Sequence, residues 1–349
     1  MSDQPRGAHL VGSVPLGSAE EVFRTMAGVL GRHLRRIPDG ETGDRFKWAG
    51  WQGFAFQQVP QFDVVLPKPG QFPPIPRFRV RDGEDLAGAR FGNLGYADEA
   101  VKSFAIFDEL QTAGVIPAHT RFQVSLPTPL APVSMFVVDD EQAAVEPVYG
   151  RAMRNELVQI LDAIPHDRLA IQWDTCVEVW IWEGWIPSPF EDVQNGVFER
   201  MQRLSRWVPE DVEMGFHLCY GDYGHVHLRE PVDSGNVVRI ANGIAARSPR
   251  PVNWIHVPVP IDRTDDAYFQ PFAELSLPEE TEFYLGLVHF RDGVEGTQLR
   301  IKSALRHLGA FGVATECGMG RRPPERGGAA DTLPELLETH AATSRPVIG

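Results

Sequence analysis

Three side chains in this sequence are of the types that bind a soft metal ion. His217 and Cys219 are two residues apart at the end of a predicted strand, so both point to the same side, and Cys317 ends another strand. Two thiolates and an imidazole form a donor set that prefers zinc. The alternative is ordinary core packing, since buried cysteine is common. A fourth donor could be His256, an oxygen of Glu316, or the substrate.

Zinc bound by two thiolates and a histidine would have a definite chemical use. It keeps one position open, and a thiol bound there is held as the nucleophilic thiolate, whereas a site closed by four protein ligands would be structural. Asp174 follows an apolar strand at 169–173 and could bind a substrate amine, or it could be a helix cap. Asp39-Gly40-Glu41 offers two further carboxylates on a tight turn.

Other histidines and tryptophans carry a weaker signal. His225 and His227 lie in a loop rich in glycine and tyrosine, and we interpret them as loop residues rather than ligands. Trp180, Trp182 and Trp185 are typical of core positions or pocket walls rather than of cofactor stacking.

Eight short β-rich runs must position these residues, and helical segments separate most of them. The runs lie at 8–14, 33–37, 121–126, 169–173, 212–218, 252–257, 282–289 and 311–315. Such alternation favours parallel βαβ units, and eight strands close a barrel, although an open doubly wound sheet is the competing layout.

The positions of the polar residues favour the barrel. They stand at or just past the predicted strand ends, where a barrel keeps its active site: Ser13, Glu41, Asp174, His217, Cys219, His256, His289 and Cys317. We therefore predict an α/β fold, with residues 1–349 forming a single (β/α)8 TIM barrel. Residues 45–95, after the second strand, lack periodicity, and we predict an insertion packed over the barrel end.

Composition limits the function further. The 349 residues carry 33 Lys and Arg against 47 Asp and Glu, a net charge of −14 that disfavours nucleic acid and anionic membranes as partners. Neither a membrane-spanning run nor a secretory signal is evident, which predicts a cytoplasmic protein with a small-molecule substrate. Three cysteines are too few for a disulfide framework. No phosphate-binding glycine loop and no G-x-S-x-G motif occur, which disfavours nucleotide, nicotinamide and flavin enzymes.

The ordered series of strand-end motifs resembles a known family over nearly the whole chain. The family is the C-terminal catalytic barrel of cobalamin-independent methionine synthase, within the uroporphyrinogen decarboxylase and methionine synthase-like superfamily. The motifs that carry the resemblance are Gly12-Ser13-Val14-Pro15, Asp39-Gly40-Glu41, Ser125-Leu126-Pro127-Thr128-Pro129, Ile171-Gln172-Trp173-Asp174, His217-Leu218-Cys219-Tyr220 and Glu316-Cys317-Gly318-Met319. The chain is also similar to epoxyalkane:coenzyme M transferases, which share the His-x-Cys and distant Cys pattern.

The resemblance implies a barrel in which zinc activates a thiol for alkyl transfer. The positions that match zinc ligands are His217, Cys219 and Cys317. The positions that match residues holding the amino-acid thiol are Ser13, Glu41 and Asp174. Thiol alkylation is the chemistry that the related transferases have in common.

Two positions depart from the family's pattern. His256 stands where the family has a zinc-binding glutamate, and a neutral ligand there would make the site less negative. Arg291 matches the family's seventh-strand histidine near the methyl donor, with His289 close by, so these two are the predicted catalytic residues.

These observations together predict a zinc-dependent methyl- or alkyltransferase with a small thiol as acceptor. Because the chain has the length of one barrel, the donor could be a folate, a corrinoid protein or another alkyl compound. The alternatives are a metal-free lyase or decarboxylase of the same superfamily and a catalytically inactive barrel that binds a small molecule.

Overall fold

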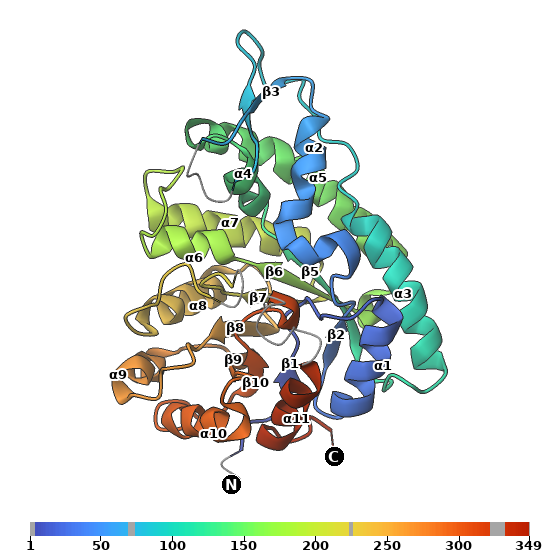
Figure 1. Cartoon of the computed structure of the whole chain (residues 1–349), viewed down its shortest axis with the longest axis vertical. Coiled ribbons are helices and arrows are strands. Elements are labelled where there is room, and N and C mark those ends of the chain that lie inside the picture. The colour runs from blue at the N-terminus through green and yellow to red at the C-terminus, as the bar shows by residue number, and fades with distance from the viewer. Residues whose placement is uncertain (1–3, 69–73, 223–225, 322–331, 349) are drawn as a thin grey trace.

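A computed structural model describes residues 4–68, 74–222, 226–321 and 332–348, and its main sheet is a nearly closed parallel barrel (Figure 1). The strands follow one another in the order β1 (Ala8–His9), β10 (Gly312–Thr315), β9 (Glu282–Val288), β8 (Trp254–Pro258), β7 (Glu213–His217), β6 (Leu169–Asp174), β5 (Arg121–Pro127) and β2 (Arg36–Pro38). At the seam between β1 and β2, the Ala8 N–H donates to the His33 carbonyl at 2.9 Å. The predicted α/β TIM-barrel fold is confirmed.

Helices surround the barrel on its outside (Figure 1). They are α1 (Ala19–Leu30), α3 (Tyr96–Thr112), α4 (Leu130–Phe136), α5 (Gln142–Ala163), α6 (Cys176–Trp182), α7 (Val193–Trp207), α8 (Gly235–Arg247), α9 (Asp266–Phe269), α10 (Gly293–Ala304) and α11 (Leu333–Thr343). Helix α1 begins at Ala19, because the Ser18 hydroxyl before it accepts from the Glu21 N–H at 3.3 Å. Its buried side chains Val22, Met26 and Leu30 recur every four residues and so form one apolar face toward the core.

Residues 45–95 lack sequence periodicity because aromatic packing, not repeated secondary structure, organises them. They include most of the 3-10 segment η1 (Gly43–Gln52), helix α2 (Gly53–Gln57) and an antiparallel hairpin of β3 (Phe62–Val65) and β4 (Arg77–Val80). The Phe56 ring stacks on Tyr149 of α5 with centroids 5.4 Å apart. Phe56 also contacts Phe78 of the hairpin at 5.8 Å, so this one ring joins the segment to the barrel's helical layer.

The first strand is much shorter than predicted. The sequence pattern suggested 8–14, but β1 ends at His9. Beyond it, side chains take the backbone carbonyls: Gln123 Nε2 donates to the Leu10 carbonyl and Ser125 Oγ to the Val11 carbonyl, each at 2.9 Å. Because these acceptors are satisfied inside the barrel, the chain leaves the sheet ladder early and is free to turn toward the substrate cavity.

Ion pairs close the amino-terminal end of the barrel. The Arg36 side chain at the start of β2 is 3% exposed and reaches Glu213 at 2.6 Å and Glu282 at 2.8 Å. Its guanidinium also lies 4.1 Å from the centre of the Trp254 ring. Each of these four residues is the first residue of its strand. Strand β8, which begins with Trp254, lies between the strands that begin with Glu213 and Glu282. This end is therefore filled, and a ligand must enter from the carboxyl ends of the strands.

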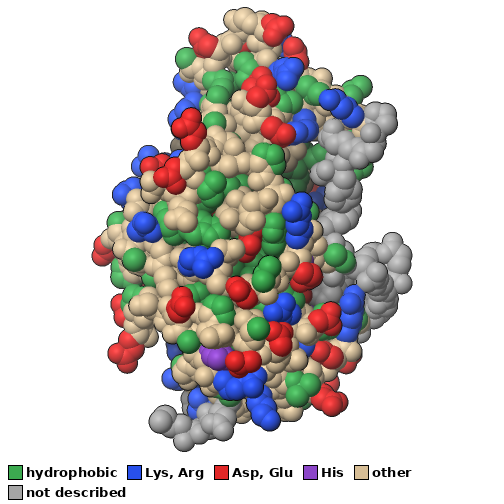
Figure 2. Space-filling view, turned by 90° about the vertical axis from the view of Figure 1, so that its left-hand side faces the viewer, with side chains coloured by type: hydrophobic (Ala, Val, Ile, Leu, Met, Phe, Trp, Pro, Cys, Tyr) green, Lys and Arg blue, Asp and Glu red, His purple; other side chains and the backbone are tan. Residues whose placement is uncertain are grey.

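The outer surface mixes both signs of charge. On the face in Figure 2, Asp and Glu side chains are interspersed with Lys and Arg, and apolar side chains lie between them. None of the helices in the described part of the chain is long and apolar enough to cross a membrane.

Candidate metal centre and substrate cavity

The three predicted donors meet at the carboxyl ends of β7 and β10. His217 ends β7, Cys219 follows two residues later, and Cys317 lies two residues beyond the end of β10. One ligand atom from each lies within 4.8 Å of the others, and the two sulfurs are 3.9 Å apart. The barrel thus brings together donors that are about a hundred residues apart in sequence.

A chain of hydrogen bonds prepares His217 to bind a cation. His256 Nε2 is 3.0 Å from the Thr315 carbonyl, so that nitrogen carries the proton and Nδ1 of the same ring is an acceptor. His217 Nδ1 lies 2.7 Å from His256 Nδ1 and must donate to it. The remaining nitrogen, His217 Nε2, is buried and has no hydrogen-bond partner among the described residues. Its lone pair is the one left for a metal ion.

His256 therefore lies behind His217 instead of joining the three donors. Both of its ring nitrogens are engaged, one by a backbone carbonyl and one by His217. Burial lowers the pKa of His256 well below its usual value, which keeps the ring neutral and able to accept this hydrogen bond. The position expected to match the family's glutamate ligand instead hydrogen-bonds His217.

Without a bound cation, the Cys219 and Cys317 thiols are poor acids. The pKa of Cys219 is raised, first by its contact with the Cys176 thiol, and that of Cys317 is raised by its contact with Cys219 and by burial. The Gly221 N–H donates to Cys219 Sγ at 3.3 Å, a contact that suits a thiolate. A buried imidazole nitrogen without a partner beside two clustered thiols fits a soft divalent cation, zinc above all.

Beside the donors lies a cavity of about 420 Å³ that the predicted substrate residues also line. Asp174 ends β6, and its carboxyl oxygens accept from Gln172 Nε2 at 3.0 Å and Trp48 Nε1 at 3.1 Å. Burial, together with the nearby Glu41 carboxyl, raises the pKa of Asp174 to about 8. Asp174 is thus a neutral acid near pH 7, and a cationic group bound beside it would lower its pKa so that it releases its proton to solvent.

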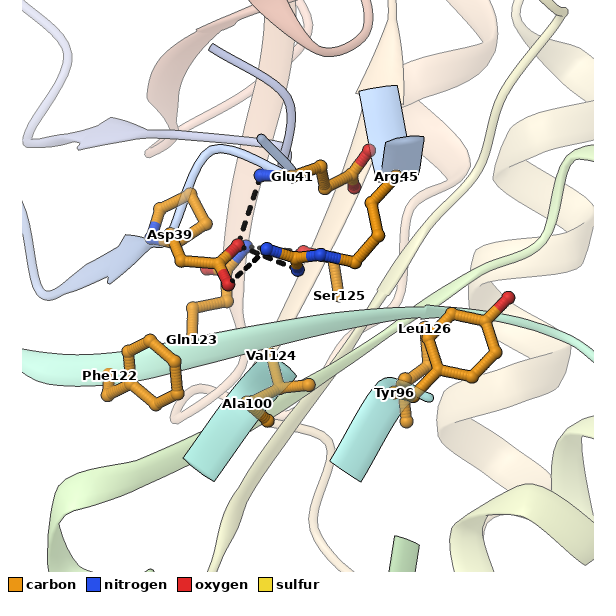
Figure 3. Close-up of a pocket in the computed structure, with 11 residues that line it drawn as sticks. Asp39, Glu41, Arg45, Tyr96, Ala100, Phe122, Gln123, Val124, Ser125 and Leu126 are labelled. Atoms are coloured by element: carbon orange, nitrogen blue, oxygen red, sulfur yellow. Dashed lines mark hydrogen bonds and ion pairs between the residues drawn. The ribbon is translucent and has the colours of Figure 1, made fainter. Parts of the chain in front are cut away.

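An ion pair holds the turn that carries Glu41 (Figure 3), and Glu41 also lines the cavity. Its backbone has φ +48°, and its N–H donates to Asp39 Oδ1 at 3.0 Å while Arg45 pairs with Asp39 at 2.8 Å. Burial raises the pKa of Glu41, which Arg321 opposes from 2.8 Å. A Cβ on Gly12 would stand 2.4 Å from Glu41 Oε1, so only glycine leaves room for the carboxyl here.

Ser13 faces the same cavity on the segment after β1. It is 1% exposed, and its hydroxyl has no hydrogen-bond partner within the described ranges. Gly318 packs against it so closely that a Cβ there would be 2.1 Å from Ser13 Oγ. The structure thus places Ser13, Glu41 and Asp174 around one cavity with the metal-binding residue types.

The two predicted catalytic residues have different surroundings. His289 is buried, donates from Nε2 to the Val259 carbonyl at 2.9 Å, and lies with Nδ1 3.4 Å from Glu316. It lines a small hollow next to the cavity together with Cys317. Arg291 is exposed, lies over the Phe290 ring at 5.9 Å, and does not line the cavity.

Two solved structures resemble this chain in fold. The candidate vitamin-B12 independent methionine synthase from Listeria monocytogenes aligns with a TM-score of 0.54 and 12% identity, covering 98% of this chain and 97% of that one. A methyltransferase from Methanosarcina mazei aligns with a TM-score of 0.50 and 12% identity, covering 97% and 94%. No protein-family model and no curated protein sequence matches. The likeness establishes the barrel fold and nothing finer.

The cavity also contains residues that the sequence did not single out as functional. Trp48 donates to Asp174 from the 45–95 segment with a backbone φ of +53°, and no local motif marks it. Arg321 ends Gly-Met-Gly-Arg, which is too short to indicate a phosphate loop, yet it pairs with Glu41.

The rest of the cavity wall is largely apolar, but Lys47, Asp222 and His227 add charged groups to it. Its apolar side chains include Trp48, Met135, Trp180, Val226 and Leu228. His227, interpreted from sequence as a loop residue, lines it as well and lies 3.0 Å from Glu316. Burial alone would lower the pKa of His227, but the carboxylates of Glu316 and Glu230 raise it to about 10. His225 lies outside the described residues.

Proposed function

We propose that this protein is a zinc-dependent transferase that moves a methyl or other alkyl group onto a thiol substrate. The observation that carries the proposal is the cluster of His217, Cys219 and Cys317 at the carboxyl end of the barrel, next to a cavity large enough for a small molecule. The methyltransferase-type fold agrees with it.

The three donors would hold the zinc ion, and His256 would orient His217 toward it. When bound, zinc supplies the positive charge that keeps a substrate thiol deprotonated, and so nucleophilic, at neutral pH. The Cys219 and Cys317 sulfurs, which line the cavity, would place this charge at the cavity wall.

The cavity residues would bind and orient the thiol substrate. Asp174 and Glu41 present two carboxyl groups to a substrate ammonium group, which replaces the proton that Asp174 carries at neutral pH. The unpartnered Ser13 hydroxyl would bond another polar group of the same molecule. An amino thiol of small size fits these contacts.

The alkyl donor would approach along the apolar wall of the cavity. A folate, a corrinoid protein or another alkyl compound could supply the group. His289, beside Cys317, is placed to serve the donor side as a proton-handling residue, and Arg291 would contact the donor only from the surface. These two assignments rest on position alone.

Metal analysis of the purified protein tests the proposal. We expect about one zinc ion per chain, bound zinc to be lost in Cys219→Ser and Cys317→Ser, and thiol-alkylating activity to be lost with it. Met135→Leu, which changes the cavity wall without removing a donor, is the matched control and should retain zinc. Protein without stoichiometric metal, or a cysteine variant with full zinc and turnover, would overturn the proposal in favour of a metal-free lyase or a binding protein.

A further inference from the structure

The third cysteine of the chain lies at the same site. Cys176 is 5% exposed, lines the cavity with His217, Cys219 and Cys317, and has its thiol close enough to Cys219 to interact with it. We propose that Cys176 is the fourth protein donor of the metal centre, which would make the resting site a three-cysteine, one-histidine site. This inference rests on the proposed function, because it requires the metal centre itself.

Strand register places Cys176 beside Cys219. Asp174 at the end of β6 is the direct partner of His217 at the end of β7. Beyond the sheet, Thr175 donates to the His217 carbonyl twice, from its N–H and from Oγ1, each at 2.9 Å. These bonds fix the residue before Cys176 to His217, two residues before Cys219. Sheet pairing, and not a mobile loop, therefore places the Cys176 and Cys219 thiols next to each other.

Two of the other protein groups near the donors are already engaged. His256 uses one nitrogen for the Thr315 carbonyl and the other for His217. The Glu316 carboxylate meets His227 with one oxygen at 3.0 Å and His289 with the other at 3.4 Å. Cys176, in contrast, has a soft donor atom at the cavity wall next to one of the three ligands.

A third sulfur would also supply the fourth donor that His217, Cys219 and Cys317 lack. The buried His217 Nε2 lone pair has no partner among the described residues and points to a cation at this place, and three donors leave one position of a tetrahedral zinc site open. Cys176 lies beside the three donors, whose ligand atoms are within 4.8 Å of one another, but is not one of that group. Rotation about its single side-chain torsion would let its sulfur join them.

A closed resting site has a functional consequence. Cys176 and a substrate thiol would compete for the same position, so the metal would be shielded from other thiols in the solvent while the cavity is empty. Zinc sites bound only by protein donors are stable, so Cys176 would also increase the affinity for the metal.

Counting sulfur atoms around the bound metal tests the inference directly. X-ray absorption of the zinc-loaded parent protein, without added thiol, should show three sulfur scatterers at about 2.3 Å and one nitrogen. Cobalt(II) substitution should give a thiolate charge-transfer band that loses the contribution of one sulfur in Cys176→Ser and in Cys176→Ala. Zinc affinity, measured by competition with a chromophoric chelator, should fall in both variants by about 10–100-fold or more. Met135→Leu should match the parent in all three measurements.

The possible failures are distinguishable. Two sulfur scatterers in the parent, with unchanged charge-transfer intensity and affinity in the Cys176 variants, would overturn the role of Cys176 and leave the proposed function standing. Parent protein that binds neither zinc nor cobalt would overturn both. Because the scatterer count uses the unmodified chain, a Cys176 variant that fails to fold does not prevent the test.

Discussion

Replacement of His256 by leucine should weaken metal binding without removing a ligand. His256 is fully buried and accepts the hydrogen bond from His217 Nδ1 that leaves His217 Nε2 for the metal. Leucine fills a similar volume but offers no acceptor, so the variant isolates the hydrogen bond from the packing.

The magnitude follows from the cost of an unpaired buried donor. Without His256, the metal-binding tautomer of His217 has a buried N–H with no partner, which costs about 1–3 kcal/mol. Metal binding holds the proton on Nδ1, whereas in the metal-free variant it can move to Nε2 on the cavity side, so up to the whole of this cost falls on metal binding. At 1.4 kcal/mol per tenfold change, zinc affinity should drop by up to about 150-fold.

The assay is competition for zinc against a chromophoric chelator at fixed pH, with cobalt(II) absorption as the second measurement. Because His256 acts through His217, the number and type of ligands should not change, and the cobalt band positions should stay those of the parent. His256→Gln, whose side-chain oxygen can accept a hydrogen bond, should recover part of the lost affinity. This rescue separates an orienting residue from one that only fills space.

Two results would refute the reasoning. A folded His256→Leu protein with parental zinc affinity would show that the hydrogen bond does not set the tautomer of His217. Loss of one nitrogen scatterer in the variant's X-ray absorption spectrum would show instead that His256 is itself a ligand, with a geometry different from the hydrogen-bonded pair described above.

Three further predictions concern the surroundings of the site. Gly318→Ala would place a Cβ 2.1 Å from Ser13 Oγ, so we expect urea unfolding to show a loss of about 1–3 kcal/mol of stability, together with a reduced zinc content. Gly88→Ala, which has open space around the new Cβ, is the control and should change neither quantity. Equal behaviour of the two variants would contradict this prediction. Asp174 keeps its proton up to about pH 8 when folded but loses it near 3.8 when unfolded, so its contribution to stability falls as the pH rises through that window. Asp174→Asn should therefore gain free energy of unfolding relative to the parent between about pH 5 and about pH 7, and a pH-independent difference would count against the buried neutral acid. Arg36→Met should lose about 1–3 kcal/mol by removing two ion pairs at the far end of the barrel, where Arg121 still pairs with Glu213 and Arg35 with Glu282, and zinc content should be unchanged; loss of zinc at full stability would be inconsistent with a purely structural plug.

Much of the site was predictable because a barrel gathers the ends of its strands. Asp174 and His217 end β6 and β7 as expected, and Cys317 lies just past β10. Once eight parallel strands are assigned, all their carboxyl ends face one opening, whatever lies between them in sequence. The residue types and the strand pattern were therefore enough to place the three donors together and to place Ser13 and Glu41 near them.

The errors arose where side chains, not strand periodicity, satisfy the backbone. The first strand ends at His9 instead of continuing to 14, because Gln123 and Ser125 bond the next carbonyls from inside the barrel. A pattern of alternating residues carries no record of such long-range partners. Trp48 escaped notice for the same reason, since only the folding of the 45–95 segment over the barrel brings its indole to Asp174.

The sequence by itself determined which chemical groups stand at the strand ends, because side-chain alternation and strand limits are local properties of the chain. Only the tertiary structure decided which of those groups contact one another and which position each takes in the site. Pairing between strands put His256 behind His217 and Cys176 beside Cys219, since register across a sheet depends on the packing of the whole barrel. The same packing left Arg291 on the surface and brought Arg321 to the Glu41 carboxyl. Contacts between segments far apart in sequence form only when the barrel closes, and no local pattern encodes them.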